Sequence, residues 1–266
     1  MNRKQSMSQP SFLMLGEWKS VEALPPLQDD EVQLWRVELT DAVSIISTYA
    51  TLLTPEEQNR ASRRRCGQVR DQFVLARACL RILLGRVLEI DPRQVPISES
   101  SYGKPETPAI NGRSVSYNVA HSQGTILIAL CRRGAVGVDV EHLDRATDIM
   151  EVAHASFTPN ETTKLAFSED PDQRKLAFYR CWTQKEAIVK ADGRGLSLSL
   201  STFEVPIHSA QSALVRIVES SRDAGKRYFV SEIPLGDQAV GAIALESPRC
   251  RINMLTFPTA LTTPEI

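Results

Sequence analysis

The order of secondary-structure signals in this chain repeats after about 100 residues, and an internal repeat restricts the possible folds more than any single segment does. Residues 54–57 read TPEE and residues 158–161 read TPNE, so each offers a threonine N-cap followed by a proline suited to the first helical position. A helical pattern follows each of them, and residues 116–130 align without a gap to residues 231–245. Chance matching of helix starts and strand alternation is the alternative explanation. A real repeat predicts two similar α+β halves with a ligand cleft between them.

Local patterns predict the main elements and the boundaries of these halves. Residues 31–39 (EVQLWRVEL) alternate as a strand does, and a helix is expected to begin after Thr54. Residues 71–88 space their apolar side chains for a second helix with one apolar face. We therefore expect four parts: a flexible N-terminal segment (1–30), an N-terminal half (31–134), a C-terminal half (135–250) and a C-terminal tail (251–266).

Composition excludes several classes of protein. The 266 residues are 42% hydrophobic and 24% charged, which suits a folded globular protein rather than a disordered one. A formal net charge of −1 argues against a nucleic-acid or anionic-membrane binder, because such proteins carry a basic excess. The 5 cysteines include no C-x-x-C pair, and no stretch has the length of a membrane span or the layout of a signal peptide. We expect a reduced, cytoplasmic protein with no nucleic-acid or membrane partner.

The stretch from Arg60 to Arg93 is rich in arginine and poor in acids. It is a candidate anion-binding surface. The alternative is a solvated helix face whose arginine stems lie over neighbouring apolar side chains.

Two acidic residues share one face of a predicted strand. In GAVGVDVEHLD, three valines alternate with Gly137, Asp139 and Glu141, so both carboxylates point to the same side. Such a pair can bind one hard cation through oxygen, and without a cation each carboxylate raises the pKa of the other. A strand with a solvated acidic face is the alternative.

A helix predicted over residues 178–192 and stopped by glycines carries a second group of polar residues. Trp182, Glu186, Val189 and Lys190 fall on one side of it. Glu186 and Lys190 also form an ordinary stabilising pair four residues apart, which explains their charges but not the aromatic beside them. This stripe can supply a third metal ligand next to a cation that binds phosphate.

In this order and spacing, G-V-D-V-E from Gly137 and W-T-Q-K-E-A-I-V-K from Trp182 resemble the two signature motifs of Sfp-type 4′-phosphopantetheinyl transferases. Upstream, residues 102–105 (YGKP) are similar to the family's G-K-P segment, and residues 117–122 (YNVAHS) to its F-N-x-S-H segment. The resemblance spans residues 54–198. It implies a pseudo-dimer of two similar α+β halves with the active site between them and the metal in the second half.

The activity that the resemblance implies is transfer of 4′-phosphopantetheine from coenzyme A to a serine of an apo acyl-, peptidyl- or polyketide-carrier protein. Adenosine 3′,5′-bisphosphate is the second product, Mg²⁺ is the cofactor and coenzyme A the cosubstrate. The enzyme is expected to be a monomer. Two rival interpretations remain: a magnesium-dependent pyrophosphate hydrolase, and an inactive module that binds coenzyme A or a carrier.

The resemblance also implies a role for each matching residue. The expected magnesium ligands are Asp139, Glu141 and Glu186. The expected contacts to coenzyme A are Lys104, Pro105, His121 and Lys190, with Arg70 or Arg77 at the 3′-phosphate. Lys190 offsets developing negative charge, and either Glu186 or Glu161 is the base that activates the carrier serine. Glu161 has a second interpretation, as the acid of a capping box with Thr158.

Two positions depart from the family pattern. Ala120 stands where the family has a serine, which removes one hydroxyl contact to a phosphate, and Gln72 stands where an arginine is usual. Both changes bear on the binding of coenzyme A rather than on the catalytic centre. The carrier is expected to dock near the mouth of the cleft, over part of the arginine-rich stretch at residues 63–65.

Overall fold

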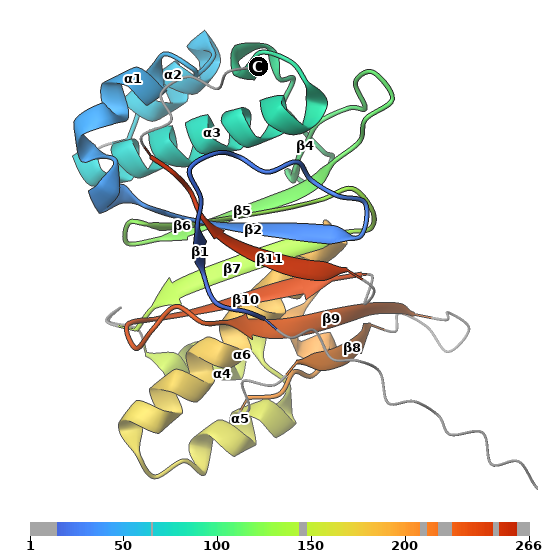
Figure 1. The fold of residues 1–266 in the computed structure, drawn as a ribbon. Helices are drawn as coiled ribbons and strands as arrows, with labels where there is room; N and C mark the ends of the chain where they lie inside the picture. The colour runs from blue at the N-terminus through green and yellow to red at the C-terminus, as the bar shows by residue number, and fades with distance from the viewer. Residues whose placement is uncertain are drawn as a thin grey trace, which may run out of the picture.

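The computed structural model describes residues 15–64, 66–143, 148–207, 212–217, 225–246 and 250–259. They form four layers, with helices α1 to α3 on one side, two sheets in the middle and helices α4 to α6 on the other side (Figure 1). None of the helices in these residues combines the length and the apolar composition that a membrane-spanning helix requires.

The first sheet has the strand order β1-β11-β2-β6-β5. Its strands are β1 (Lys19–Ser20), β2 (Glu31–Glu38), β5 (Ser116–Ser122), β6 (Thr125–Cys131) and β11 (Arg251–Thr256). The helices on its outer side are α1 (Ile46–Ala50), α2 (Pro55–Ser62) and α3 (Gly67–Leu88), with short 3-10 turns at Leu39–Asp41, Val43–Ile45 and Pro92–Gln94. A small hairpin joins β3 (Ser98–Glu99) to β4 (Pro105–Glu106).

The second sheet has the strand order β7-β10-β9-β8. Its strands are β7 (Val136–His142), β8 (Ala213–Ile217), β9 (Lys226–Ile233) and β10 (Ala239–Leu245). The helices are α4 (Ile149–Ser156), α5 (Pro159–Ala166) and α6 (Pro171–Asp192), followed by 3-10 turns at Gly195–Ser197 and Leu200–Thr202. In each sheet a first strand pairs with the second strand of a later antiparallel hairpin: β2 with β6, and β7 with β10. The expected fold of two similar α+β halves is confirmed.

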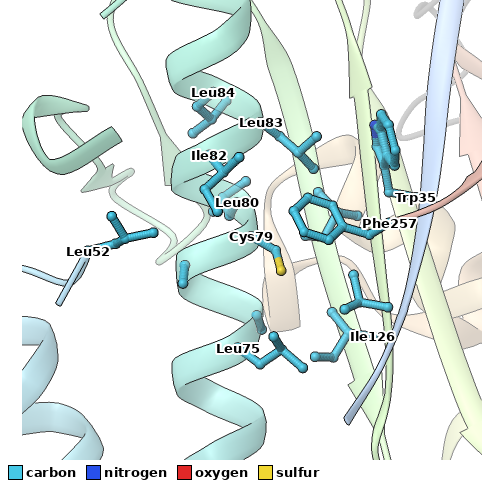
Figure 2. Close-up of a cluster of buried hydrophobic side chains, with 14 of the residues drawn as sticks. Trp35, Leu52, Leu75, Cys79, Leu80, Ile82, Leu83, Leu84, Ile126 and Phe257 are labelled. Carbon is cyan, nitrogen blue, oxygen red and sulfur yellow. The ribbon is translucent and has the colours of Figure 1, made fainter. Parts of the chain in front are cut away.

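Three apolar clusters hold the layers together. One lies between α3 and the first sheet, where Trp35, Leu75, Cys79 and Ile126 meet (Figure 2). A second lies between α6 and the second sheet. The third lies between the two sheets, where Leu34 and Leu127 of the first half are in the same cluster as valines of β7. The two halves therefore share an apolar interface.

Both predicted helix starts are confirmed as capping boxes. The Thr54 side chain accepts a bond from the Glu57 N–H while the Glu57 carboxylate accepts from the Thr54 N–H, and Thr158 and Glu161 do the same before α5. The long helices are each 22 residues and begin earlier than expected, at Gly67 and Pro171. The start of α6 had a readable signal, since Asp170 caps it and proline stands at its first position.

The gap-free alignment of residues 116–130 with 231–245 is wrong in register. The turn between β5 and β6 is residues 123–124, whereas residues 234–238 separate β9 from β10. Moreover, Leu130 faces α3 whereas its aligned partner Leu245 lies between the sheets. A shift of one residue exchanges the two faces of a strand. Because β6 and β10 are buried on both faces, their apolar runs did not reveal the shift.

The two ends of the chain contribute to the fold where the structure describes them. Trp18 donates its indole N–H to the Pro234 carbonyl, and Leu24 and Leu27 are buried, so some residues of the segment expected to be flexible pack against the fold. Residues 251–256, expected in a tail, form β11, which pairs in parallel with both β1 and β2. Residues 1–14 of the expected segment and 260–266 of the expected tail lie outside the described residues. The division at residue 134 stays a prediction.

A buried ion pair joins the capped helix to the long helix in each half. The Arg81 Nε lies 2.8 Å from the Glu57 Oε2, and the Lys185 Nζ lies 2.8 Å from the Glu161 Oε2. In both halves the same number of residues separates the cap threonine from the acid, and the same number separates the acid from the cation. These pairs are therefore equivalent positions of the internal repeat.

The first pair makes stability depend on pH. Burial by itself raises the pKa of Glu57, but the bonds from Arg81 and from the Thr54 N–H outweigh burial and lower the pKa below its usual 4.5. A carboxylate with a lowered folded pKa stabilises the fold above its unfolded pKa, and this contribution is lost as pH falls through the folded pKa. We expect Glu57→Gln to cost about 3 kcal/mol at pH 7, as breaking a buried pair does. Urea unfolding should show this difference shrinking below pH 4.5; a difference independent of pH contradicts the argument.

Candidate active site

Gly137 lets β7 approach α6 more closely than any other residue would allow. A Cβ atom at this position would lie 2.1 Å from the Ala187 carbonyl oxygen and 2.4 Å from the Ala191 nitrogen. Real Cβ atoms essentially never come within 3.0 Å of such atoms. The glycine of the G-V-D-V-E motif therefore sets the spacing that brings the face of β7 carrying Asp139 against the face of α6 carrying Lys190.

Asp139 and Lys190 meet at this contact. The Lys190 Nζ lies 2.6 Å from the Asp139 Oδ1. The other carboxylate oxygen, Oδ2, is buried and has no hydrogen-bond partner. Burial is the main cause that raises the pKa of Asp139 to about 6, against the opposing effect of Lys190. An unpartnered, buried anionic oxygen is costly, and a cation is the ligand that offsets this cost.

The carboxylates of Glu141 and Glu186 lie close enough to act on Asp139 and on each other. Both raise the pKa of Asp139, and burial, with a smaller contribution from Glu141, raises that of Glu186. The Glu141 Oε2 accepts a bond from the Ser122 hydroxyl at 3.3 Å. In the described part of the chain, no three acidic, histidine or cysteine side chains are already arranged closely enough to hold a metal ion by themselves. The donor set still fits Mg²⁺, which takes a few carboxylate oxygens and leaves its other positions to water and phosphate.

A cleft of about 550 Å³ lies beside this group, between the two halves. Glu186 and Lys190 line it from α6, and Lys104 and Pro105 line it from the first half. The Lys104 Nζ donates to the Ala191 carbonyl at 3.2 Å, and burial lowers the pKa of Lys104. The structure thus brings four of the predicted site residues to one cavity and places Asp139 against one of them.

Asn118, within the segment YNVAHS, joins the two halves. Its Oδ1 accepts the Val138 N–H at 2.9 Å, next to Asp139, on the edge of β7 that does not pair with β10. We expect Asn118→Ala to cost about 1–3 kcal/mol, because it leaves the buried N–H unsatisfied. Chemical denaturation measures this cost. Asn59→Ala, on the exposed face of α2, is the control and should stay within about 0.5 kcal/mol of the wild type; an equal cost for both variants contradicts the bridging role.

His121 lies among positive charges. The partial loss of solvent around its ring, and then the charges of Lys190 and Arg64, lower its pKa. His121 is therefore neutral at pH 7 until an anion binds near it. The Arg64 guanidinium stacks on the Phe73 ring at 4.3 Å from its centroid, and its Nε is buried without a hydrogen-bond partner. Sequence reasoning placed Arg64 in the expected docking stretch at residues 63–65 but did not identify it as a phosphate contact.

The two arginines expected at the 3′-phosphate already have acidic partners. The Arg70 Nη2 lies 2.8 Å from the Asp71 Oδ1, and the Arg77 Nε lies 3.5 Å from the Glu57 Oε1. Gln72, which replaces the usual arginine, is buried and its Nε2 has no partner. Arg64 differs from both in having a buried Nε that makes no hydrogen bond.

Glu161 is buried in a closed network. Its Oε2 accepts from the Thr158 N–H and hydroxyl and pairs with Lys185, while its Oε1 accepts the Val205 N–H. Its side chain is 1% exposed. A general base needs a free oxygen within reach of the substrate, and both oxygens of Glu161 are occupied. This geometry argues against Glu161 as the base and leaves Glu186, which lines the cleft.

Comparison with known proteins places this geometry in a family. Residues 135–244 match the family model of the 4′-phosphopantetheinyl transferase superfamily. The 4′-phosphopantetheinyl transferase HetI of Nostoc sp. is 31% identical over 222 residues, covering 82% of this chain and 89% of HetI. The protein slr0495 of Synechocystis sp. is 38% identical over 194 residues, covering 73% and 77%. The 4′-phosphopantetheinyl transferase Sfp of Bacillus subtilis is 25% identical over 172 residues, covering 65% and 74%. This chain therefore belongs to the 4′-phosphopantetheinyl transferase superfamily.

Proposed function

We propose that this enzyme transfers 4′-phosphopantetheine from coenzyme A to a serine hydroxyl of an apo carrier protein and releases adenosine 3′,5′-bisphosphate. Family membership supports the activity. The observation that carries it for this chain is the buried, unpartnered Asp139 Oδ2 beside Lys190, at a cleft lined by residues of both halves.

The residues that would hold Mg²⁺ are Asp139, Glu141 and Glu186. The bound ion would withdraw negative charge from the pyrophosphate. Lys190, which now contacts Asp139, would exchange this contact for one with a phosphate oxygen as negative charge develops there. Glu186 would accept the proton of the carrier serine, since its pKa is raised by burial and its carboxylate lines the cleft. Lys104 and Pro105 would contact the nucleotide end of coenzyme A from the other wall.

We further propose that Arg64, with His121, binds the 3′-phosphate in place of Arg70 or Arg77. The supporting observation is the unpartnered Arg64 Nε beside a histidine whose pKa is lowered by positive charge. Arg64→Ala should raise KM for coenzyme A about tenfold, the loss of a charge-assisted bond, and leave KM for 3′-dephospho-coenzyme A unchanged. Arg70→Ala is the matched control and should change neither value much. Equal effects of Arg64→Ala on both cosubstrates would remove the assignment.

The carrier would dock at the mouth of the cleft, near Arg63 and Arg64. Arg65, the third residue of the expected docking stretch, lies outside the described residues. Unchanged carrier affinity after charge reversal at Arg63 would remove the basis for this docking. The monomeric state and the cytoplasmic location stay predictions.

Mass spectrometry of a panel of apo carriers with coenzyme A and Mg²⁺ tests the proposed function. The expected result is a phosphopantetheine mass gain on at least one carrier, lost when Mg²⁺ is chelated. Release of adenosine 3′,5′-bisphosphate without a carrier would instead indicate the pyrophosphate hydrolase. Binding of coenzyme A with no mass change on any carrier would indicate the inactive module.

A further inference from the structure

Lys185 is a fully buried charged residue that the proposed reaction does not use. Its side chain is 0% exposed and is not among the residues that line the cleft, although its neighbour Glu186 is. Its Nζ pairs with Glu161 and donates to the carbonyls of Leu200 at 2.7 Å and Phe203 at 2.5 Å. A lysine ammonium has three donors, so all three are satisfied. Such complete pairing offsets the several kcal/mol that burying an ammonium otherwise costs.

The two carbonyl acceptors of Lys185 belong to residues 195–206, which we call the wall segment. Other bonds also anchor this segment. The Val205 N–H donates to the Glu161 Oε1 at 2.8 Å, and the Gln184 Nε2 donates to the Pro206 carbonyl at 3.0 Å. The Glu204 carboxylate accepts from the Thr158 hydroxyl at 3.3 Å and from the Asn160 Nδ2 at 2.9 Å. The wall-segment residues that line the cleft are Gly195, Leu198, Ser199 and Leu200. The wall segment has little regular structure beyond two short 3-10 turns, so side-chain anchors fix its position.

The equivalent pair in the first half provides a contrast. Arg81 pairs with Glu57 and also donates to nearby carbonyls, those of Pro92 at 2.9 Å and Val95 at 3.1 Å. That loop contributes no residue to the cleft. The repeat thus contains the same buried ion pair twice, and only the pair in the second half borders the active site.

We propose that the Glu161–Lys185 pair is a positioning device that holds the wall segment against α5 and α6 and so shapes the cleft for phosphopantetheine transfer. The role in transfer rests on the proposed function, whereas the hold on the wall segment does not. Lys185 and Glu161 act through Leu200, Phe203 and Val205 and touch neither substrate.

Hydrogen exchange measured by mass spectrometry tests the hold directly. In Lys185→Met we expect the amides of residues 198–205 to exchange at least about tenfold faster than in the wild type, because their anchor is lost. Arg81→Met is the matched control: it breaks the equivalent buried pair and should leave exchange of these amides unchanged. Unchanged exchange in Lys185→Met, or an equal increase in both variants, overturns the proposal.

Kinetics then separate positioning from base catalysis. Glu161→Gln and Lys185→Met should each lower kcat/KM about 10- to 100-fold, as a misplaced cleft wall does, and the double variant should lose little more than either single one. Loss of kcat in Glu161→Gln with unchanged exchange would instead make Glu161 the base and overturn the proposal. If the wild type shows no transfer, the proposed function fails while the exchange result still stands.

If Lys185→Met does not fold, Gln184→Met provides a second test of the proposal. This variant removes only the bond to Pro206 and preserves the length of the side chain. It should accelerate exchange in residues 198–205 by a smaller factor and lower kcat/KM in proportion. Normal exchange throughout the wall segment of this variant counts against the proposal.

Discussion

Replacing Gly137 with alanine is expected to destabilise the protein by at least about 3 kcal/mol, at the upper end of the usual cost of overpacking. The added methyl group meets backbone atoms of Ala187 and Ala191 rather than flexible side-chain ends, so β7 and α6 must move apart. The same movement separates Asp139 from Lys190. We therefore expect the folded fraction of Gly137→Ala to lose activity beyond its loss of stability. Urea unfolding, and activity corrected for the folded fraction, measure the two effects.

Gly67→Ala is the control for this prediction. Gly67 is the first residue of α3, and a Cβ atom there would meet nothing within 4 Å. The control should be neutral or more stable by about 0.5–1 kcal/mol, since alanine is the better helix former. If Gly137→Ala were as stable as the control, β7 and α6 could accommodate the extra methyl group. Gly137 would then not set the spacing between them.

Much of the fold could be predicted because its signals are local. The Thr54 and Thr158 caps and the recurring order of elements predicted two α+β halves, and the structure has them. The register of the repeat could not be predicted from β6 and β10, because a strand that is apolar on both faces looks the same after a shift of one residue. The place of residues 251–256 in the first sheet depends on long-range pairing with β1 and β2, which leaves no local pattern.

The candidate site, like the fold, could be predicted from the sequence only in part. Strand alternation placed Asp139 and Glu141 on one face, and helix periodicity placed Glu186 with Lys190, but neither pattern brings β7 and α6 together. The structural reason is Gly137, which is small enough to let β7 lie against α6. The motif includes this glycine, but the sequence does not show which helix packs against it. The candidate phosphate contact of Arg64 was not predicted, because it depends on a buried Nε without a partner, which no sequence pattern shows.

The internal repeat also explains why one half alone carries the site. At the same offset that relates Thr54 to Thr158, Trp35 corresponds to Asp139 and Ile82 to Glu186. Trp35 and Ile82 are both fully buried in the cluster between α3 and the first sheet (Figure 2). Carboxylates in those places would be buried without the cleft that admits a cation and phosphate. In the first half, apolar side chains therefore occupy the positions that carry the candidate site residues in the second half.

Asp139→Asn is expected to lower kcat/KM for coenzyme A at least about 100-fold, the scale set by losing one preorganised electrostatic contact in the transition state. Asparagine keeps the shape of the side chain and can still accept from Lys190, so the loss reports the missing charge rather than a cavity. Asp41→Asn removes an exposed acid that does not line the cleft and is the control, with wild-type kinetics expected.

Metal binding gives a second measurement that does not depend on turnover. In the wild type, Mn²⁺ at 100 times its Kd should stabilise the fold by about 2.7 kcal/mol, because it binds the folded protein alone. The Asp139→Asn protein should lose nearly all of this stabilisation, since the buried Oδ2 without a partner is the oxygen that the substitution neutralises. Electron paramagnetic resonance of free Mn²⁺ measures the affinity independently. Full metal-induced stabilisation in Asp139→Asn, together with lost transfer, would mean that Asp139 acts on the substrate through Lys190 and that the metal lies elsewhere.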